Sequence, residues 1–226
     1  MKLQSAGESA IIAYLGETSS AEVSAQVQTL GAALRVEMGS RLVDLTPSYA
    51  SLLVSFDPLQ IDHFQVGELI RACFANLESQ SLQPGKLIEI PVYYHPDSGE
   101  DLLSLAEAGD LAWEEIVAIH SAQEYRVYAI GFAPGFAYLG DVDERIAAPR
   151  QSTPRQRVPR GAVAIADRQT AVYPAESPGG WNLIGRSPLR MFDPSAAQPM
   201  PVAVGDRVRF RPIEREAFLS AGGALT

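Results

Sequence analysis

The chain has 226 residues, of which 46% are hydrophobic and 20% are charged, and its formal net charge at pH 7 is −9. This length and composition are typical of a globular protein with one large or two small domains. Residues 1–124 carry 5 Lys and Arg against 18 Asp and Glu, whereas residues 125–226 carry 13 against 9. An acidic first half argues against nucleic acid as a partner of the whole chain, and a basic second half allows a local anion site.

No stretch of the sequence approaches the roughly 20 apolar residues of a membrane span. The apolar run at 11–15 is too short for a signal peptide and follows Glu8. Cys73 is the single cysteine, so it forms no internal disulfide, and it falls on the apolar face of a predicted helix. We therefore expect a cytoplasmic protein with a buried, structural cysteine.

The first 92 residues predict a βαββαβ order. The expected elements are a strand at 9–15, a helix at 21–38, strands at 41–45 and 51–56, a helix at 61–77 and a strand at 87–92. The two helices carry apolar residues at spacings of three and four, which places one apolar stripe on each. Two helices on one face of an antiparallel sheet are the ferredoxin-like arrangement. The break at Gln83-Pro84-Gly85 predicts a small ferredoxin-like domain over residues 1–84, although the strand at 87–92 fits either domain.

Residues 85–226 predict a second, β-rich domain. A short helical pair at 101–108 and 113–121 precedes a strand at 125–132. Short apolar runs then follow at 162–166, 170–173, 181–184 and 207–210, separated by turns rich in Pro and Gly. This pattern favours a closed β-barrel over a packed helix layer. The expected fold class is therefore α+β.

The stretch GFAPGFAYLG, residues 131–140, places Phe132, Phe136 and Tyr138 among three glycines and Pro134, without any charge. Glycine and proline predict a loop or tight turn. Aromatic side chains on such a loop indicate a surface that receives a ligand or another protein. The alternative is a loop that folds inward as a satellite core, and the ten residues alone favour neither.

An arginine-rich segment follows at 149–166, where Arg150, Arg155, Arg157 and Arg160 alternate with prolines. The planar guanidinium suits carboxylate or phosphate. A solvated basic edge is the simpler interpretation of such a run. The prolines favour an organised anion site instead, because they order the backbone that presents the charges.

Two further features have both structural and functional interpretations. Gly179-Gly180 before Trp181 lets the backbone pass close to a ligand on which the indole could stack, but the tryptophan alone indicates core. His120 shares a helical face with Trp113 and Ile116, which also indicates a core residue. The proximity of Glu124 and the aromatic loop supports a role for His120 in catalysis.

Several familiar sites are absent from the sequence. It contains no G-x-x-x-x-G-K-[ST] phosphate loop, no G-x-G-x-x-G after a strand and no G-x-S-x-G elbow. Three scattered histidines and one cysteine do not form a structural zinc site, so we expect no bound metal.

Five motifs taken together resemble one family. Between His120 and Pro212 they are GFAPGFAYLG, PR-x3-PR-x2-VP-x-G, QT-x2-YP, SPGGWNLIGR and MFDP followed by GDRVRF. The chain resembles the family of the 5-oxoprolinase B subunit (PxpB), the sporulation-kinase inhibitor KipI and allophanate hydrolase subunit 1, the smaller part (subdomain C and D) of the carboxyltransferase domain of urea carboxylase. The resemblance extends more loosely over the first half, and it implies a cyclophilin-like barrel for the second domain.

The resemblance also implies site residues. Those matching the family's ligand-binding pattern are Phe132, Pro134, Phe136, Tyr138, Gln169, Thr170, Tyr173, Ser177, Gly179, Gly180, Trp181 and Arg186. Arg150 and Arg155 fall on the arginine motif and, with His120, are the candidate catalytic residues. The chain departs from the family pattern at Asp167, Arg168 and Ala171, around the Gln-Thr pair.

The functions implied by the resemblance fall into three classes. The first is a subunit of an ATP-dependent 5-oxoprolinase that opens 5-oxo-L-proline to L-glutamate, inactive alone. It would act with a larger subunit (PxpC/KipA-like) and a lactam-binding subunit (PxpA-like), and the complex would bind ATP. The second is a cyclophilin-like inhibitor of a sensor histidine kinase. The third is one half of a biotin-dependent carboxyltransferase, which a chain without a biotin-attachment Met-Lys-Met segment does not support.

Overall fold

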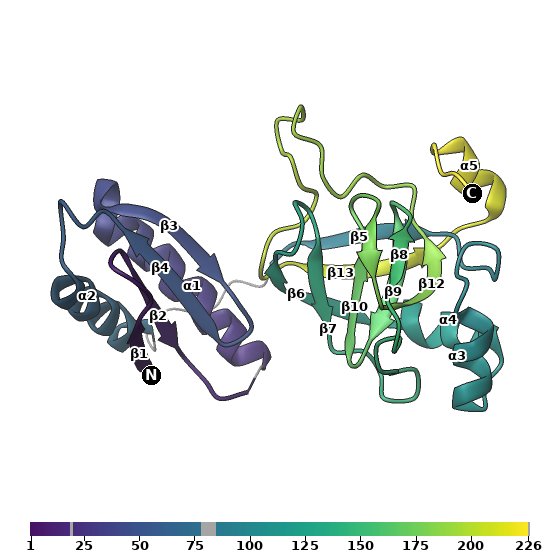
Figure 1. The fold of residues 1–226 in the computed structure, drawn as a ribbon, viewed down its shortest axis with the longest axis horizontal. Helices are drawn as coiled ribbons and strands as arrows, with labels where there is room; N and C mark the ends of the chain where they lie inside the picture. The colour runs from purple at the N-terminus through teal and green to yellow at the C-terminus, as the bar shows by residue number, and fades with distance from the viewer. Residues whose placement is uncertain (19, 78–84, 226) are drawn as a thin grey trace. The chain divides into compact units, whose positions relative to one another are not determined.

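The computed structural model describes residues 1–18, 20–77 and 85–225, and the chain divides into two compact units, Met1–Pro84 and Gly85–Thr226 (Figure 1). Gln83 and Pro84 of the predicted boundary lie outside the described residues. No helix within the described ranges is both long and apolar enough to cross a membrane.

The first unit is an antiparallel sheet packed against two helices (Figure 1). Its strands, in spatial order, are β1 (Lys2–Ser5), β2 (Ala10–Tyr14), β4 (Ser51–Phe56) and β3 (Leu42–Pro47). The helices are α1 (Ala21–Met38), followed by a 3-10 turn at Gly39–Arg41, and α2 (His63–Ala75). Alternate residues of β2 and β4 join the apolar stripes of both helices in one core, as the helical spacing predicts.

The six elements of the βαββαβ order predicted for the first 92 residues are all present, but strand β1, which the sequence pattern does not predict, precedes them. The expected sixth element is strand β5 (Leu87–Val92), which belongs to the sheet of the second unit. There it pairs in parallel with β13 (Arg207–Pro212), and its Ile90 and Val92 are buried in that core. The edge position beside β2 is taken by β1. The ferredoxin-like assignment of the first unit therefore stays a prediction.

The second unit is built on a seven-stranded sheet that nearly closes into a barrel. The spatial order is β12 (Asn182–Arg186), β9 (Ala162–Ala166), β10 (Gln169–Val172), β7 (Ala137–Gly140), β6 (Glu124–Ile130), β13 and β5. The two edge strands meet where Tyr93 and Arg186 exchange backbone hydrogen bonds, each with an N···O distance of 2.9 Å. These bonds join the ends of the sheet and confirm the barrel-like arrangement that the sequence predicts.

The other elements of the second unit surround this barrel. Helices α3 (Leu102–Gly109), α4 (Trp113–Ala122) and α5 (Arg215–Ser220) lie beside it, and β8 (Arg155–Val158) pairs with β11 (Ser177–Gly179) in a separate two-stranded sheet. Helix α4 contacts β13, so its inner face helps to fill the barrel core.

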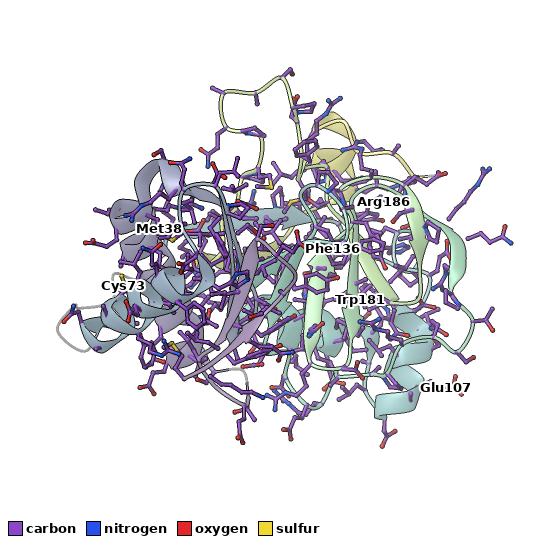
Figure 2. The ribbon with its side chains drawn as sticks, turned by 60° about the vertical axis from the view of Figure 1, so that its left-hand side comes forward. Met38, Cys73, Glu107, Phe136, Trp181 and Arg186 are labelled. Atoms are coloured by element: carbon purple, nitrogen blue, oxygen red, sulfur yellow. The ribbon has the colours of Figure 1, made fainter. Side chains whose placement is uncertain are left out.

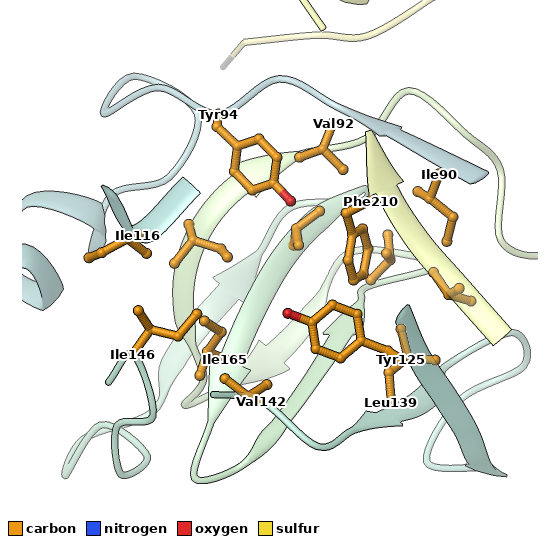
Figure 3. Packing of buried hydrophobic residues seen from close by; sticks show 14 of the residues in the cluster. Ile90, Val92, Tyr94, Ile116, Tyr125, Leu139, Val142, Ile146, Ile165 and Phe210 are labelled. Atoms are coloured by element: carbon orange, nitrogen blue, oxygen red, sulfur yellow. The ribbon is translucent and has the colours of Figure 1, made fainter. Parts of the chain in front are cut away.

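The barrel is packed on both faces. Inside, Tyr125 and Phe210 lie among buried aliphatic side chains (Figure 3). Along β9, Val163 and Ile165 join this inner core, while the intervening alanines join a second cluster with Phe136. All five residues of β9 are buried, as expected for a strand covered on both faces. The outer cluster is an aromatic layer, and it positions the candidate site.

Candidate functional site

A cavity of about 170 Å³ opens in the aromatic layer outside the barrel, and we call it the aromatic pocket. Its lining residues are Phe132, Phe136, Tyr138, Arg150, Gln151, Pro154, Tyr173, Pro178, Gly179, Gly180 and Trp181. The aromatic loop, the arginine-rich segment and the SPGGW turn thus all contribute to one cavity. Within the described residues, no group of three or more His, Cys, Asp or Glu could hold a metal ion.

The aromatic loop forms one wall of the pocket. Phe136 is buried, and its ring makes edge contacts with Tyr173 at a centroid distance of 5.3 Å and with Trp181 at 5.6 Å. Figure 2 labels Phe136 and Trp181 among the side chains of the second unit. Phe132 remains 66% exposed. Gly135 has a φ of +84°, and a Cβ at this position would overlap the carbonyl oxygen of Met191. The loop therefore needs glycine at position 135. It packs Phe136 into a small hydrophobic core and leaves Phe132 exposed at the opening of the pocket.

Tyr173 forms the buried polar part of the pocket. Burial raises the pKa of its phenol, while a hydrogen bond from the Trp181 backbone and the charge of Arg150 act in the opposite direction. The hydroxyl is therefore protonated at neutral pH. A Cβ on Gly179 would overlap the Tyr173 hydroxyl, so glycine is what allows this close approach.

Replacing Gly179 with alanine is expected to displace Tyr173 and narrow the aromatic pocket. Because the new methyl group overlaps a buried ring, the free energy of unfolding should fall by about 1–3 kcal/mol. Gly180→Ala is the matched control, since its Cβ would meet its nearest neighbour, the Gln151 carbonyl oxygen, at an ordinary 3.4 Å. Urea unfolding followed by tryptophan fluorescence measures both variants, and equal losses would contradict the close approach at Gly179.

Arg150 lies at the rim of the pocket. Its Cζ atom lies 5.8 Å from the centroid of the Trp181 ring, within cation–π range. The guanidinium is exposed and makes no ion pair or hydrogen bond with any other described residue. Arg150 is therefore a cation positioned beside an aromatic cavity and available to an anionic ligand.

Arg155 does not line the pocket. Its Nη2 donates to Asp101 Oδ1 at 2.5 Å and its Nε donates to Glu100 Oε2 at 3.3 Å. The Asp101 carboxylate also accepts hydrogen bonds from the Leu183 backbone N–H and from Gln151 Nε2. Arg155 thus ties β8 to the start of α3 and to β12. The sequence motif made Arg155 a candidate catalytic residue, whereas in the structure its guanidinium is bonded to Asp101 and Glu100 of the same chain.

His120 lies inside the barrel, away from the aromatic pocket. Thr170 Oγ1 donates to the Ala164 carbonyl, so it accepts a hydrogen bond from His120 Nε2 at 2.9 Å. His120 Nδ1 then accepts from the Tyr94 hydroxyl at 2.7 Å. Both ring nitrogens are satisfied in the neutral imidazole, and burial lowers its pKa to about 3. This supports the interpretation of His120 as a core histidine and not its role as a catalytic residue.

Acidification should therefore destabilise the second unit through His120. The unfolded chain binds a proton below pH 6.5 but the folded chain only near pH 3, so stability falls as pH falls through this window. The expected slope is about 1.4 kcal/mol per pH unit. His120→Leu should be less stable at pH 7 yet show a shallower slope, measured by urea unfolding between pH 4.5 and 6.5. His95→Gln, which removes a half-exposed ring, is the control, and an unchanged slope in His120→Leu would contradict the assignment.

The other predicted ligand-binding residues do not line the pocket. Pro134 is exposed, Gln169 pairs with Ala166 in the β9–β10 hairpin, and Ser177 pairs with Val158 in the small sheet. Arg186 is buried in β12, where its Nη1 donates to the Ala224 carbonyl at 2.5 Å. The structure instead adds Gln151, Pro154 and Pro178 to the lining.

Comparison with known proteins places this arrangement in a family. The B subunit of the 5-oxoprolinase of Bacillus subtilis is 34% identical over 96% of this chain and 95% of its own length. The protein of the same name from Haemophilus influenzae is 36% identical over 93% of this chain and 97% of its own length. The crystal structure of TTHA0988 superposes with a TM-score of 0.80 and 36% identity over 91% of this chain, which spans only 40% of TTHA0988.

The fold agrees with these relatives, since the nearly closed barrel of the second unit matches the cyclophilin-like fold that the resemblance implies. Residues 1–202 match the family described as carboxyltransferase domain, subdomain C and D. The chain therefore belongs to the carboxyltransferase subdomain C and D family, which includes the B subunits of 5-oxoprolinase.

Proposed function

We propose that this chain is a subunit of an ATP-dependent 5-oxoprolinase, which opens 5-oxo-L-proline to L-glutamate. Relatives at 34% and 36% identity over nearly their whole length are named as the B subunit of 5-oxoprolinase, which supports the assignment. In the proposed complex the chain works with a larger partner and a lactam-binding subunit, and ATP is bound by the assembly. The aromatic pocket of this chain contacts the lactam together with that lactam-binding subunit.

One observation carries the proposal that the chain works only as a subunit. The lining of the aromatic pocket offers binding groups, namely aromatic rings and the free cation Arg150. None of the described lining residues is an Asp, Glu, His, Lys, Cys, Ser or Thr. The pocket therefore suits the binding of a small anionic ligand but supplies no nucleophile and no general base of ordinary pKa.

The chemistry explains why other chains are needed. Transfer of the γ-phosphoryl group of ATP to the lactam oxygen gives ADP and an activated carbon. Water adds to that carbon, and the C–N bond breaks as the nitrogen takes up a proton, which leaves an acyl phosphate. A second water then hydrolyses the acyl phosphate to the glutamate carboxylate and free phosphate. Phosphoryl transfer and water attack both need charged or basic groups held in place. In this division of labour the chain holds a ligand while partner chains provide the reacting groups.

A docking role is the alternative that the aromatic loop favours. Phe132, two-thirds exposed at the mouth of the pocket, suits a contact with another protein. In the kinase-inhibitor hypothesis that contact is made with a histidine kinase, and no chemistry is required of the chain.

Reconstitution tests the proposal. The chain alone should release no glutamate from 5-oxoproline and ATP, and the mixture with the larger partner and the lactam-binding subunit should release it in an ATP-dependent manner. Glutamate release by the chain alone would contradict the subunit role. A complete mixture without activity would instead favour the docking role, which binding to a histidine kinase would then test.

A further inference from the structure

A chain of amide hydrogen bonds joins Gln151, which lines the aromatic pocket, to Asn182, which does not. Asn182 Nδ2 donates to the carbonyl oxygens of Pro149 at 2.9 Å and Ile165 at 3.1 Å. Because backbone carbonyls only accept, these two bonds fix the orientation of the Asn182 amide. Its Oδ1 is therefore an acceptor, and it faces Gln151.

Gln151 is fixed in turn by its neighbours. Its Nε2 donates to Asn182 Oδ1 at 2.7 Å and to Asp101 Oδ1 at 3.3 Å. Asp101 is an acceptor here, because its two oxygens also receive hydrogen bonds from Arg155 and from the Leu183 backbone. A flipped Gln151 amide would turn its oxygen toward two acceptors and lose both bonds. The backbone is held as well, by a 2.7 Å bond from Gln151 N to the Gly180 carbonyl.

This arrangement leaves one strong acceptor for a ligand. Both hydrogens of Gln151 Nε2 are donated to Asp101 and Asn182, and Oε1 receives no hydrogen bond from any described residue. Gln151 lines the pocket, and its Oε1 is not among the buried polar atoms that lack a partner. The acceptor is therefore accessible on a residue that lines the cavity, and it suits a hydrogen-bond donor on a bound ligand.

We propose that Gln151 is the specificity-determining residue of the aromatic pocket, where its Oε1 accepts a hydrogen bond from an amide N–H of the bound ligand. The ligand class is a small ring that carries an amide N–H and a carboxylate. This inference rests on the proposed function, from which it takes 5-oxoproline as its probe. Gln151 lies outside the motif residues that the resemblance assigns.

The other polar groups of the pocket complement this acceptor. The Tyr173 hydroxyl accepts from the Trp181 backbone N–H, which leaves its own hydrogen to donate to the ligand carbonyl. Arg150 supplies the cation for the carboxylate, and Phe136 with Trp181 supplies the apolar walls. An amide N–H, a carbonyl and a carboxylate thus each have one matching group.

Ligand discrimination by the full-length chain tests the proposal. The probes are 5-oxo-L-proline, its N-methyl derivative and the lactone in which oxygen replaces the ring N–H, each titrated while Trp fluorescence or heat is recorded. A site built around an acceptor rejects analogues without the donor, so 5-oxoproline should bind roughly ten- to a hundredfold more tightly than the lactone. Gln151→Met, of similar length but without the acceptor, should bring that ratio close to one.

Two controls separate recognition from folding. Gln198→Met makes the same exchange on an exposed loop and should keep the wild-type ratio. Gln151→Asn keeps the amide but withdraws it by one methylene, and it too should lose the discrimination. Reduced stability lowers the apparent affinity for both probes by the same factor, so the ratio of the two affinities does not change. Circular dichroism therefore needs to show only that part of each variant is folded.

The results of this binding experiment can be distinguished from those of the reconstitution experiment. Equal binding of 5-oxoproline and the lactone by the wild-type chain, or full discrimination retained by Gln151→Met, overturns the role of Gln151. The absence of any binding at millimolar probe also overturns it. Glutamate release by the reconstituted mixture would still support the subunit function in each of those cases.

Discussion

Arg155→Ala is expected to lower the free energy of unfolding of the second unit by about 2–3 kcal/mol. The change leaves the carboxylate of Asp101, whose side chain is only 9% exposed, without its cation. Asp101 keeps its hydrogen bond from the Leu183 backbone N–H. Its buried carboxylate nevertheless loses the favourable charge interaction with the guanidinium, which lowers the stability of the folded state. Both tryptophans, Trp113 and Trp181, lie in the second unit, so urea unfolding followed by tryptophan fluorescence reports on this unit.

Arg157→Ala is the matched control on the same strand. Arg157 is 83% exposed and its Nε lies 3.8 Å from Glu176, so its loss should change the free energy of unfolding by less than about 0.5 kcal/mol. A double-mutant cycle with Asp101→Asn isolates the Arg155–Asp101 interaction. Similar losses for the two arginines, or no coupling in the cycle, would show that the Arg155 tie contributes nothing to stability.

The positions of the two helices of the first unit can be predicted from local sequence signals. The apolar spacing predicts α1 with the bounds that the structure has, Ala21–Met38. Helix α2 begins at His63 instead of residue 61, because Asp62 and Gln65 form a capping box. That pair is visible in the sequence and indicates a helix that begins at residue 63. Strand β1, by contrast, has one partly buried apolar residue, Leu3, and carries no alternating pattern.

The strand pairing of the second unit cannot be predicted from local sequence signals alone. Strand β5 pairs with β13, which lies about 120 residues later in the chain. Its apolar pattern fits either unit, and only the tertiary pairing decides. The sequence does not predict β7, β8 or β11 either. Residues 131–140 are expected to form a loop, yet Ala137–Gly140 form β7, and β8 and β11 are short and flanked or interrupted by proline. Proline disfavours a central strand but is tolerated in an isolated two-stranded sheet.

The candidate site could be predicted only in part from the sequence, because some of its residues depend on tertiary contacts. The three segments that line the pocket are visible as runs of Gly, Pro and aromatic residues. Asp101 looks like an ordinary acid at the start of a helix, and Gln151 like a polar residue in a basic segment. Their importance depends on Arg155 and Asn182, which lie 54 and 31 residues away. Such long-range polar contacts produce no periodic pattern in the sequence.

Arg150→Met in the reconstituted complex is expected to lower kcat/KM for 5-oxoproline roughly ten- to a hundredfold, the loss of one charge-assisted hydrogen bond. Methionine keeps an apolar stem beside Trp181, so the packing of the rim is retained while the charge is removed. Arg160→Met makes the same exchange on an exposed arginine of the same segment that does not line the pocket, and it should leave turnover unchanged.

The division of the Arg150→Met effect between KM and kcat identifies the group that Arg150 binds. The ligand carboxylate carries the same charge in the substrate and in the transition state, so losing its partner should raise KM and leave kcat unchanged. Charge on the phosphorylated lactam oxygen develops only during the reaction, and losing a group that stabilises it would lower kcat instead. Because Arg150 is already in place beside the pocket, we expect the first result. A fall in kcat at constant KM would assign Arg150 to the phosphoryl group, and no change in either constant would remove it from the site.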